Sequence, residues 1–208
     1  MNYSLSQIIA DTRVWIGHNH EDLPLIAIAD PYTLSLDELI RSKVELAARM
    51  VVSEAPAQML MPGCPVRTRL SWQGRPGRGM AMLPLPEDFL RLLTVRLSDW
   101  HRPARIITDD DPSCRWQSSP FAGVRGNPAR PVAVVTASPA GKVVELYSSM
   151  AGPSVRLIQA QYVPCPRVTD GWIRLPESLY HDVVARVAHL TMQSYHTDPI
   201  CSQHCDMS

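Results

Sequence analysis

The spacing of hydrophobic positions changes twice along the chain, from a helical repeat to alternation and then back to a helical repeat. At the start, Ser4 followed by Gln7 forms a capping-box pattern, and Gly17 is the type of residue that ends a helix. The apolar positions between them share one helical face; they are Leu5, Ile8 and Ile9, with Thr12 beside them. This pattern predicts a first short helix.

A second capping box, Ser35 with Glu38, opens a longer helical repeat. Its apolar positions recur every three or four residues: Leu36, Leu39, Ile40, Val44, Ala47 and Val51. The repeat predicts a helix over about 35–53. Near the end of the chain, Pro176 and Glu177 suit a first helical turn. A further stripe follows there, Leu179, Val183, Val187 and Leu190, and predicts a closing helix over about 176–196.

Between these helices, apolar residues alternate with polar ones, as in half-buried strands. The first such segment has Val66, Thr68, Leu70 and Trp72 in alternation. Further extended segments are predicted at 80–83, 89–100, 103–108, 132–137, 142–149 and 154–163. The turn Ser138–Gly141 joins two of them as a hairpin, which predicts a β-meander.

The order helix, helix, strands, helix predicts an α+β fold in one domain. A small helical core would comprise about 4–53 and 176–196, with an antiparallel β-meander excursion over about 64–165. Residues 197–208 are expected to form a flexible tail. A Leu-Pro break precedes a packed segment twice, at Leu85-Pro86 and at Leu175-Pro176, and marks where an extended segment must stop.

Composition narrows the function classes. The 208 residues carry 20 Lys and Arg against 20 Asp and Glu, and a net charge of zero argues against a dedicated nucleic-acid binder. Arginine outnumbers lysine 18 to 2, which suits protein interfaces but also follows from GC-rich coding, and both explanations stay open. Five scattered cysteines, no signal-peptide pattern and no long apolar window predict a soluble protein with reduced thiols, made in a cytoplasm.

Candidate chemistry is sparse. Two clusters have metal-ligating residue types: His18, His20 and Asp22, and His196 with Cys201, His204 and Cys205. The first cluster has no fourth ligand and the second lacks the paired spacing of a structural zinc site, so a polar loop and a frayed terminus are the simpler explanations. There is no Gly-x-Ser-x-Gly, and the glycines of 123–131 lack the lysine of a phosphate loop. We therefore predict no catalytic, metal or cofactor site and no enzyme, the alternative being a small enzyme with a nonlocal Cys/His or metal site.

Tryptophan and arginine interleave near the ends of the predicted strands, and both are enriched at interaction hot spots. The candidate interface residues are Trp72, Arg75, Arg78, Trp100, Arg102, Trp116, Arg125 and Trp172. The alternative is that these tryptophans pack over the ends of a sheet.

The order of segments resembles that of the head–tail connector, or adaptor, proteins of tailed bacteriophages. The resemblance rests on "IIADTRVWIG", "SLDELIRSKVELAARMVV", "GMAMLPLPEDFLRLLTVRLSDW" and "RLPESLYHDVVARVAHLTMQSYHTDP". The resemblance covers roughly residues 4–196, and over this range the chain is similar to the ring proteins of short-tailed and crAss-like phages. The loop of 109–131 is longer than in the simplest adaptors.

This resemblance implies a structural virion protein without cofactors. It implies a homo-oligomeric ring, typically of twelve copies, between the portal protein and the next neck or tail ring, with DNA passing only through the lumen and no membrane contact. Helices would pack between ring neighbours, and the β-rich part would face the next tier. A monomeric binding module remains the third interpretation.

Overall fold

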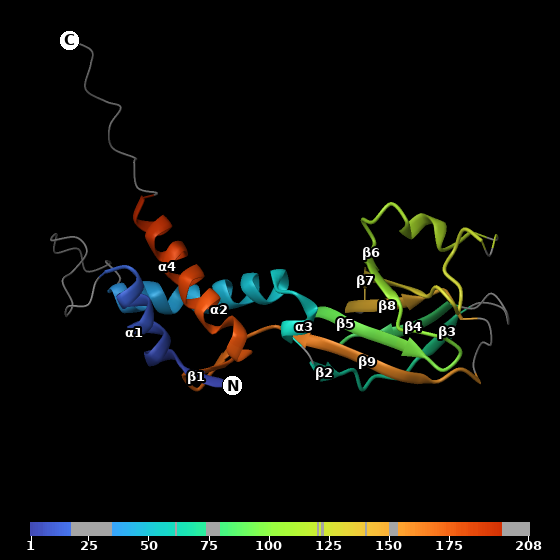
Figure 1. The fold of residues 1–208 in the computed structure, drawn as a ribbon, viewed down its shortest axis with the longest axis horizontal. Helices are drawn as coiled ribbons and strands as arrows, with labels where there is room; N and C mark the ends of the chain where they lie inside the picture. The colour runs from blue at the N-terminus through green and yellow to red at the C-terminus, as the bar shows by residue number, and fades with distance from the viewer. Residues whose placement is uncertain are drawn as a thin grey trace, which may run out of the picture. The chain divides into compact units, whose positions relative to one another are not determined.

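The computed structural model describes residues 1–17, 35–60, 62–73, 80–119, 121, 123–139, 141–149 and 154–196, with backbone alone at the last two positions. It has the α+β composition that the sequence predicts. The chain divides into two compact units. The helical unit is Met1–Met59 with Pro166–Ser208, and the β unit is Leu60–Cys165. Where one domain was expected, each part is compact in its own right (Figure 1).

Among the described residues, three long helices make up most of the helical unit. They are α1 (Leu5–Trp15), α2 (Leu36–Glu54) and α4 (Tyr180–His196), and α4 packs on both of the others (Figure 1). A 3-10 turn over Glu177–Leu179 leads into α4, and the short α3 (Ala57–Leu60) follows α2. All three long helices therefore begin within a few residues of the predicted positions.

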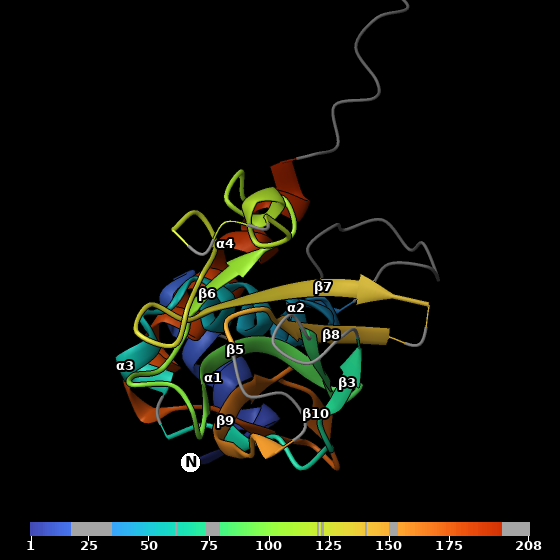
Figure 2. The same ribbon diagram turned by 90° about the vertical axis from the view of Figure 1, so that its right-hand side faces the viewer.

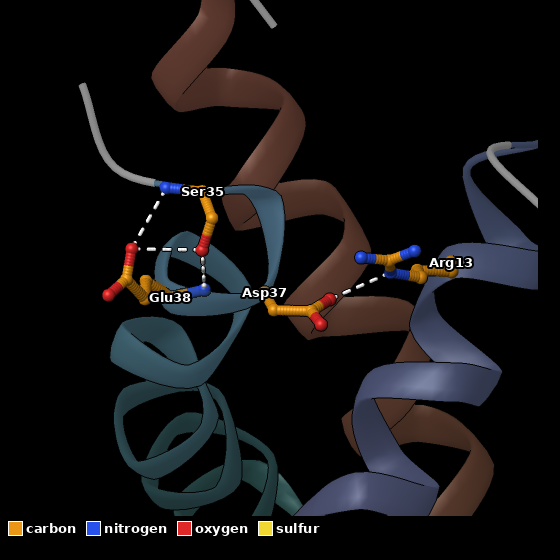
Figure 3. A network of polar contacts seen from close by, with 4 residues as sticks. All are labelled: Arg13, Ser35, Asp37 and Glu38. Carbon is orange, nitrogen blue, oxygen red and sulfur yellow. Dashed lines mark hydrogen bonds and ion pairs between the residues drawn. The ribbon is translucent and has the colours of Figure 1, made fainter. Parts of the chain in front are cut away.

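Capping fixes the start of α2. The Ser35 hydroxyl accepts from the Glu38 backbone N–H at 3.3 Å, and the Glu38 carboxylate accepts from the Ser35 backbone N–H at 2.9 Å (Figure 3). This reciprocal pair is the predicted capping box. Beside it, Arg13 Nε lies 2.7 Å from Asp37 Oδ1 and ties α1 to α2. At the other end of α1, Gly17 has φ 75°, as a residue that follows a helix C-terminus often does.

The predicted apolar stripes form the core of the helical unit. Ile8 of α1, Ile40 and Val44 of α2, and Val183 and Val187 of α4 have no exposed surface. At the edge of this core the Tyr180 ring stacks on Tyr3 at 4.2 Å, and its hydroxyl donates to the Asp11 carboxylate. Burial and this acceptor raise the pKa of Tyr180.

A small antiparallel sheet, absent from the sequence prediction, completes the helical unit. Its strands are β1 (Asn2–Ser4), β11 (Trp172–Arg174) and β10 (Val168–Thr169), in that order. The β10–β11 turn is Asp170-Gly171, where φ is 51° and 79°. Both residues adopt positive φ, as a type I′ hairpin turn requires.

Eight strands form the β unit in two sheets (Figures 1 and 2). One sheet has the order β2-β9-β5 and the other β3-β4-β8-β7-β6. The strands are β2 (Cys64–Pro65), β3 (Ser71–Gln73), β4 (Met80–Pro84), β5 (Phe89–Leu97), β6 (Arg105–Thr108), β7 (Val132–Ser138), β8 (Gly141–Leu146) and β9 (Leu157–Pro164).

The core of the β unit draws on both sheets. Leu83 of β4 and Leu146 of β8 come from one sheet, and Val95 of β5 and Ala160 of β9 come from the other. Trp100 belongs to the same core with 2% of its surface exposed. The two sheets therefore share one apolar interior, as in a sandwich.

The predicted meander is wrong in its connections. The β7–β8 hairpin forms as expected, but β9 leaves that sheet and pairs with β5 and β2. Strand β6 runs parallel to β7, with Arg105 opposite Val132. A parallel pair cannot be joined by a tight turn, so the long segment 109–131 is the crossover that this pairing requires. The predicted strand through 66–72 is also interrupted, because β2 ends just before it, at Pro65, and β3 begins only at Ser71.

Candidate interaction surfaces

Large apolar side chains are exposed on both units. On the helical unit they are Met1, Val14, Trp15, Leu46, Met59 and Trp172. On the β unit they are Trp116, Phe121, Val124 and Ile158. Three of the four on the β unit belong to the crossover 109–131, so apolar exposure there is concentrated in one segment. Contiguous apolar exposure on a folded chain marks interaction sites.

A buried glutamine gives the crossover its shape. The Gln117 side chain is 4% exposed although the segment around it lies at the surface. Its Oε1 accepts from the Gly126 backbone N–H at 2.9 Å, and its Nε2 donates to the Ser113 carbonyl at 3.1 Å. The short 3-10 helix Cys114–Trp116 lies between these contacts. One polar side chain therefore joins the two halves of the crossover.

Close backbone packing fixes the second half of the crossover. A Cβ atom at Gly126 would lie 2.3 Å from Ser148 Oγ and 3.0 Å from a methyl carbon of Val132. The Ser148 hydroxyl also accepts from the Val132 backbone N–H at 2.9 Å. Only glycine leaves room for this approach, so the end of the crossover is held against β7 and the residues after β8.

The acidic residues at the start of the crossover are engaged locally. The Asp111 carboxylate accepts from the Ser113 hydroxyl at 2.5 Å and from its backbone N–H at 2.8 Å, and these bonds lower the pKa of Asp111. Thr136 Oγ1 donates to Asp109 Oδ2 at 3.2 Å. The carboxylate of Glu145, on β8, accepts from the Tyr147 hydroxyl at 2.6 Å. Burial and this bond raise the pKa of Tyr147.

Two adjoining pockets follow from this framework. One, of about 480 Å³, is lined by residues 102–105 and 130–132, and the other, of about 500 Å³, lies between β6 and the crossover. Arg105, Arg130 and Val132 line both pockets, Arg102 lines the first and Arg125 the second. No Asp or Glu is among the described residues that line either pocket. We call Arg102, Arg105, Arg125 and Arg130, with Trp116 at the wall of the second pocket, the arginine surface.

The parallel pairing of β6 and β7 brings these arginines together. Parallel strands start at the same edge of a sheet, so Arg105 at the start of β6 lies opposite Val132 at the start of β7. The Arg105 backbone N–H donates to the Pro131 carbonyl at 2.9 Å, and the His101 N–H donates to the Pro128 carbonyl at 3.0 Å. Residues about 25 positions apart in sequence thereby line the same pocket.

The helical unit carries a different surface. A groove of about 610 Å³ lies between the C-terminal end of α2 and the first turns of α4. Its apolar lining is Val51, Ala55, Pro56, Met59, Leu179 and Ala185. Its charged lining residues are Glu54, Asp182 and Arg186, with His189 beside them. Arg186 Nη2 lies 3.0 Å from Glu54 Oε2, so a cation and an anion neutralise each other across the groove.

The predicted interface residues differ in whether they are exposed, line a pocket or are buried. Trp116 is 49% exposed and Trp172 is 52% exposed, whereas Arg102 and Arg125 line the pockets of the arginine surface. Trp100 was wrongly placed at a surface, because its ring fills the β-unit core. Trp72 is half-buried and packs against the same core. Both residues therefore pack in or against the core, which agrees with the alternative that these tryptophans have a packing role.

Several predicted positions lie outside the described residues: Arg75, Arg78, His18, His20, Asp22, Cys201, His204 and Cys205. The side chain of His196 is likewise outside the description, although its backbone ends α4. Sequence reasoning missed Arg105, Arg130, Trp15 and Phe121. The first two become recognisable only once β6 and β7 are known to be parallel, because a meander would separate them.

The described residues show little nucleophilic or metal-binding chemistry. No group of three or more His, Cys, Asp and Glu side chains among them is arranged to hold a metal ion. Cys114, in the crossover, has its thiol pKa raised by burial and then by Glu145, Asp109 and Asp111. A thiol with a raised pKa stays protonated at neutral pH and is a weak nucleophile. Nor does any helix in the described ranges have the length and apolar character needed to cross a membrane.

No model of a known protein family matches the chain, and no curated protein matches it in sequence. The features of this chain that bear on its function are therefore these two surfaces and the order of its segments.

Proposed function

We propose that the chain is a structural subunit of the neck of a tailed bacteriophage, where copies form a ring between the portal and the tail. The observation that carries this proposal is that each of the two compact units has an exposed surface of its own. The helical unit has an apolar groove, and the β unit has the arginine surface. A ring subunit between two tiers needs separate surfaces for separate neighbours.

The helical unit suits contact between like subunits. Its groove is predominantly apolar, and the charge of Glu54 is compensated there by Arg186, which leaves Asp182 as the one uncompensated carboxylate among the described lining residues. The unit also presents Trp172 at 52% exposure. A surface that meets a different patch on the next copy produces a ring when the rotation closes.

The β unit is inserted between two parts of the helical unit, which supports its role as a separate contact module. The chain leaves the helical unit after Met59 and re-enters it at Pro166. Both Leu-Pro breaks have structural roles: the turn at Pro86 accepts the Phe89 N–H at 3.1 Å and starts β5, and Pro176 precedes the first turn toward α4. The two Leu-Pro breaks, which are part of the resemblance, thus lie where packed elements begin.

Native mass spectrometry of the chain alone, and mixed with the portal protein of the same source, tests the proposal. We expect a closed ring, either spontaneously or only with the portal. Met59→Glu places a carboxylate in the apolar groove and should reduce ring formation. Gln58→Glu is the matched control, because Gln58 lies on the same short helix and is exposed but does not line the groove. A chain that stays monomeric with and without the portal would contradict the proposed function.

A further inference from the structure

The arginine surface has a charge pattern that the ring proposal does not by itself explain. Four guanidinium groups line two adjoining pockets, and no described carboxylate lines either of them. The Arg105 side chain is 71% exposed, and its Nη2 lies 3.7 Å from Asp111 Oδ2, which is a long distance for an ion pair. Among the described residues, Arg102, Arg125 and Arg130 form no ion pair.

The carboxylates of Asp109, Asp111 and Glu145 lie outside both pocket linings and accept hydrogen bonds from Thr136, Ser113 and Tyr147. Asp111 is also the partner of Arg105 in the 3.7 Å ion pair. The framework that presents the arginines is also fixed in advance, since Gln117 and Gly126 hold the crossover in place. Presenting cations on a rigid frame lowers the ordering cost of binding an anion.

We propose that the arginine surface binds a carboxylate-rich segment of a neighbouring protein. The guanidinium fork matches a carboxylate in a bidentate arrangement, and Arg105 and Arg130, which line both pockets, could each bridge adjacent carboxylates. Trp116, Phe121 and Val124 are 49%, 72% and 51% exposed and supply apolar contacts in the same segment. Arginine with exposed aromatic side chains is a composition typical of protein interfaces.

Charge and shape favour a protein segment over a nucleic acid. A phosphate backbone is best bound by an extended positive surface, whereas this chain has a net charge of zero. A short acidic segment needs only the two pockets. That the neighbouring protein belongs to the phage neck rests on the proposed function. That its segment is rich in carboxylates rests only on the charges of this chain.

Fluorescence anisotropy tests the inference with a labelled peptide in which glutamate alternates with alanine. We expect binding that weakens with salt, because the arginines are exposed to solvent. The same peptide with glutamine in place of glutamate should not bind. The double variant Arg105→Ala/Arg130→Ala should bind about tenfold more weakly or worse, since charge-assisted bonds are lost.

Two further variants serve as the control and as the charge-conserving comparison in the peptide-binding measurement. Arg67→Ala/Arg69→Ala is the matched control, because both residues are exposed on the β unit and neither lines either of the two pockets of the arginine surface. It should bind like the unmodified chain. Arg105→Lys/Arg130→Lys keeps the charge but loses the fork and should fall between the two, which decides the matter if the alanine variant does not fold.

Three results would overturn the inference. They are equal binding of the glutamate and glutamine peptides, equal loss in the control variant, and tighter binding of single-stranded oligothymidylate that depends on Arg105 and Arg130. The last result would assign the surface to a nucleic acid. Rings without glutamate-peptide binding would refute the inference alone, and peptide binding by a chain that never forms rings would refute the proposed function alone.

Discussion

Arginine has different surroundings in the two units. In the helical unit, Arg13 pairs with Asp37 at 2.7 Å and Arg186 pairs with Glu54 at 3.0 Å, and each pair joins two helices. In the β unit, the arginine surface lines two pockets, and the Arg105–Asp111 pair there is 3.7 Å long. These two arginines of the helical unit thus link helices, whereas the arginine surface of the β unit presents its charge to solvent.

An arginine count therefore says little about function until the partners of each side chain are known. Arginines are spread over the whole sequence, but the arginine surface gathers four of them around two pockets that no described carboxylate lines. Changes that affect one unit and spare the other test this difference between the units.

The largest effects should come from the two cores. Ile40→Ala in α2 and Leu83→Ala in β4 each remove a fully buried side chain, which typically costs about 2–5 kcal/mol in the free energy of unfolding. Because each unit has its own core, each variant should speed backbone hydrogen exchange mainly in its own unit. Exchange measured by mass spectrometry checks this. Equal acceleration in both units for either variant would show that they unfold as one.

The next largest effect concerns the frame of the arginine surface. Gly126→Ala would place a Cβ 2.3 Å from Ser148 Oγ, and we expect a loss of about 1–3 kcal/mol in the stability of the β unit. Gly123→Ala is the control in the same crossover, because nothing lies within 4 Å of its built Cβ. Urea denaturation compares the two variants. Similar stabilities would mean that the crossover is not packed as described.

A pH-dependent effect should follow in the β unit. The Tyr162 hydroxyl donates to Asp88 Oδ1 at 3.0 Å, and burial followed by this bond raises the pKa of Tyr162 to about 12. The neutral tyrosine is favoured in the folded state. Its stabilisation is therefore complete below the ordinary pKa of about 10 and is lost as the pH rises through 12.

Tyr162→Phe removes this titration and, at neutral pH, should cost about 1–2 kcal/mol for the lost bond. Denaturation midpoints measured between neutral pH and strong alkali should fall less steeply above pH 10 for the variant than for the unmodified chain. Parallel alkaline decline in both would contradict a shared bond between Tyr162 and Asp88.

The smallest effect should come from the cap of α2. Ser35→Ala removes the acceptor of the Glu38 N–H and should cost about 1 kcal/mol in the helical unit. Ser42→Ala is the control, because its exposed hydroxyl only donates to the Leu39 carbonyl within the helix. Thermal denaturation compares them, and equal melting temperatures would mean that the cap does not stabilise α2.

Glu38 adds a pH dependence to this cap. Bonds from the Ser35 backbone and hydroxyl lower the pKa of Glu38, so the carboxylate is favoured in the folded state. Its contribution is present above the ordinary glutamate pKa and is lost as the pH falls through the lowered value.

Local patterns predicted the helices, because capping boxes and apolar stripes act over a few residues. Ser35 with Glu38 and the stripe through Ile40 and Val44 needed no knowledge of the rest of the chain. The β10–β11 hairpin was equally local, since Asp170-Gly171 between Thr169 and Trp172 is a strong turn signal. It was missed because both strands are very short.

Strand pairing could not be predicted in the same way. Alternation located β5, β7, β8 and β9, but nothing in the alternation says that β9 pairs with β5 across a long stretch of sequence. The candidate surface depended on that missing information. Arg125 and Trp116 stood out by residue type, whereas Arg105 and Arg130 share pockets only because β6 and β7 are parallel.

Electron microscopy of the chain mixed with the portal of the same source is the decisive test of the proposed ring. It shows whether copies of the chain assemble, and which unit contacts the neighbouring copies and which the portal. We predict a ring of this chain seated on the portal, with helical units contacting one another and the arginine surface turned toward the next tier. Portal particles without added density, together with a monomeric chain, would contradict the account.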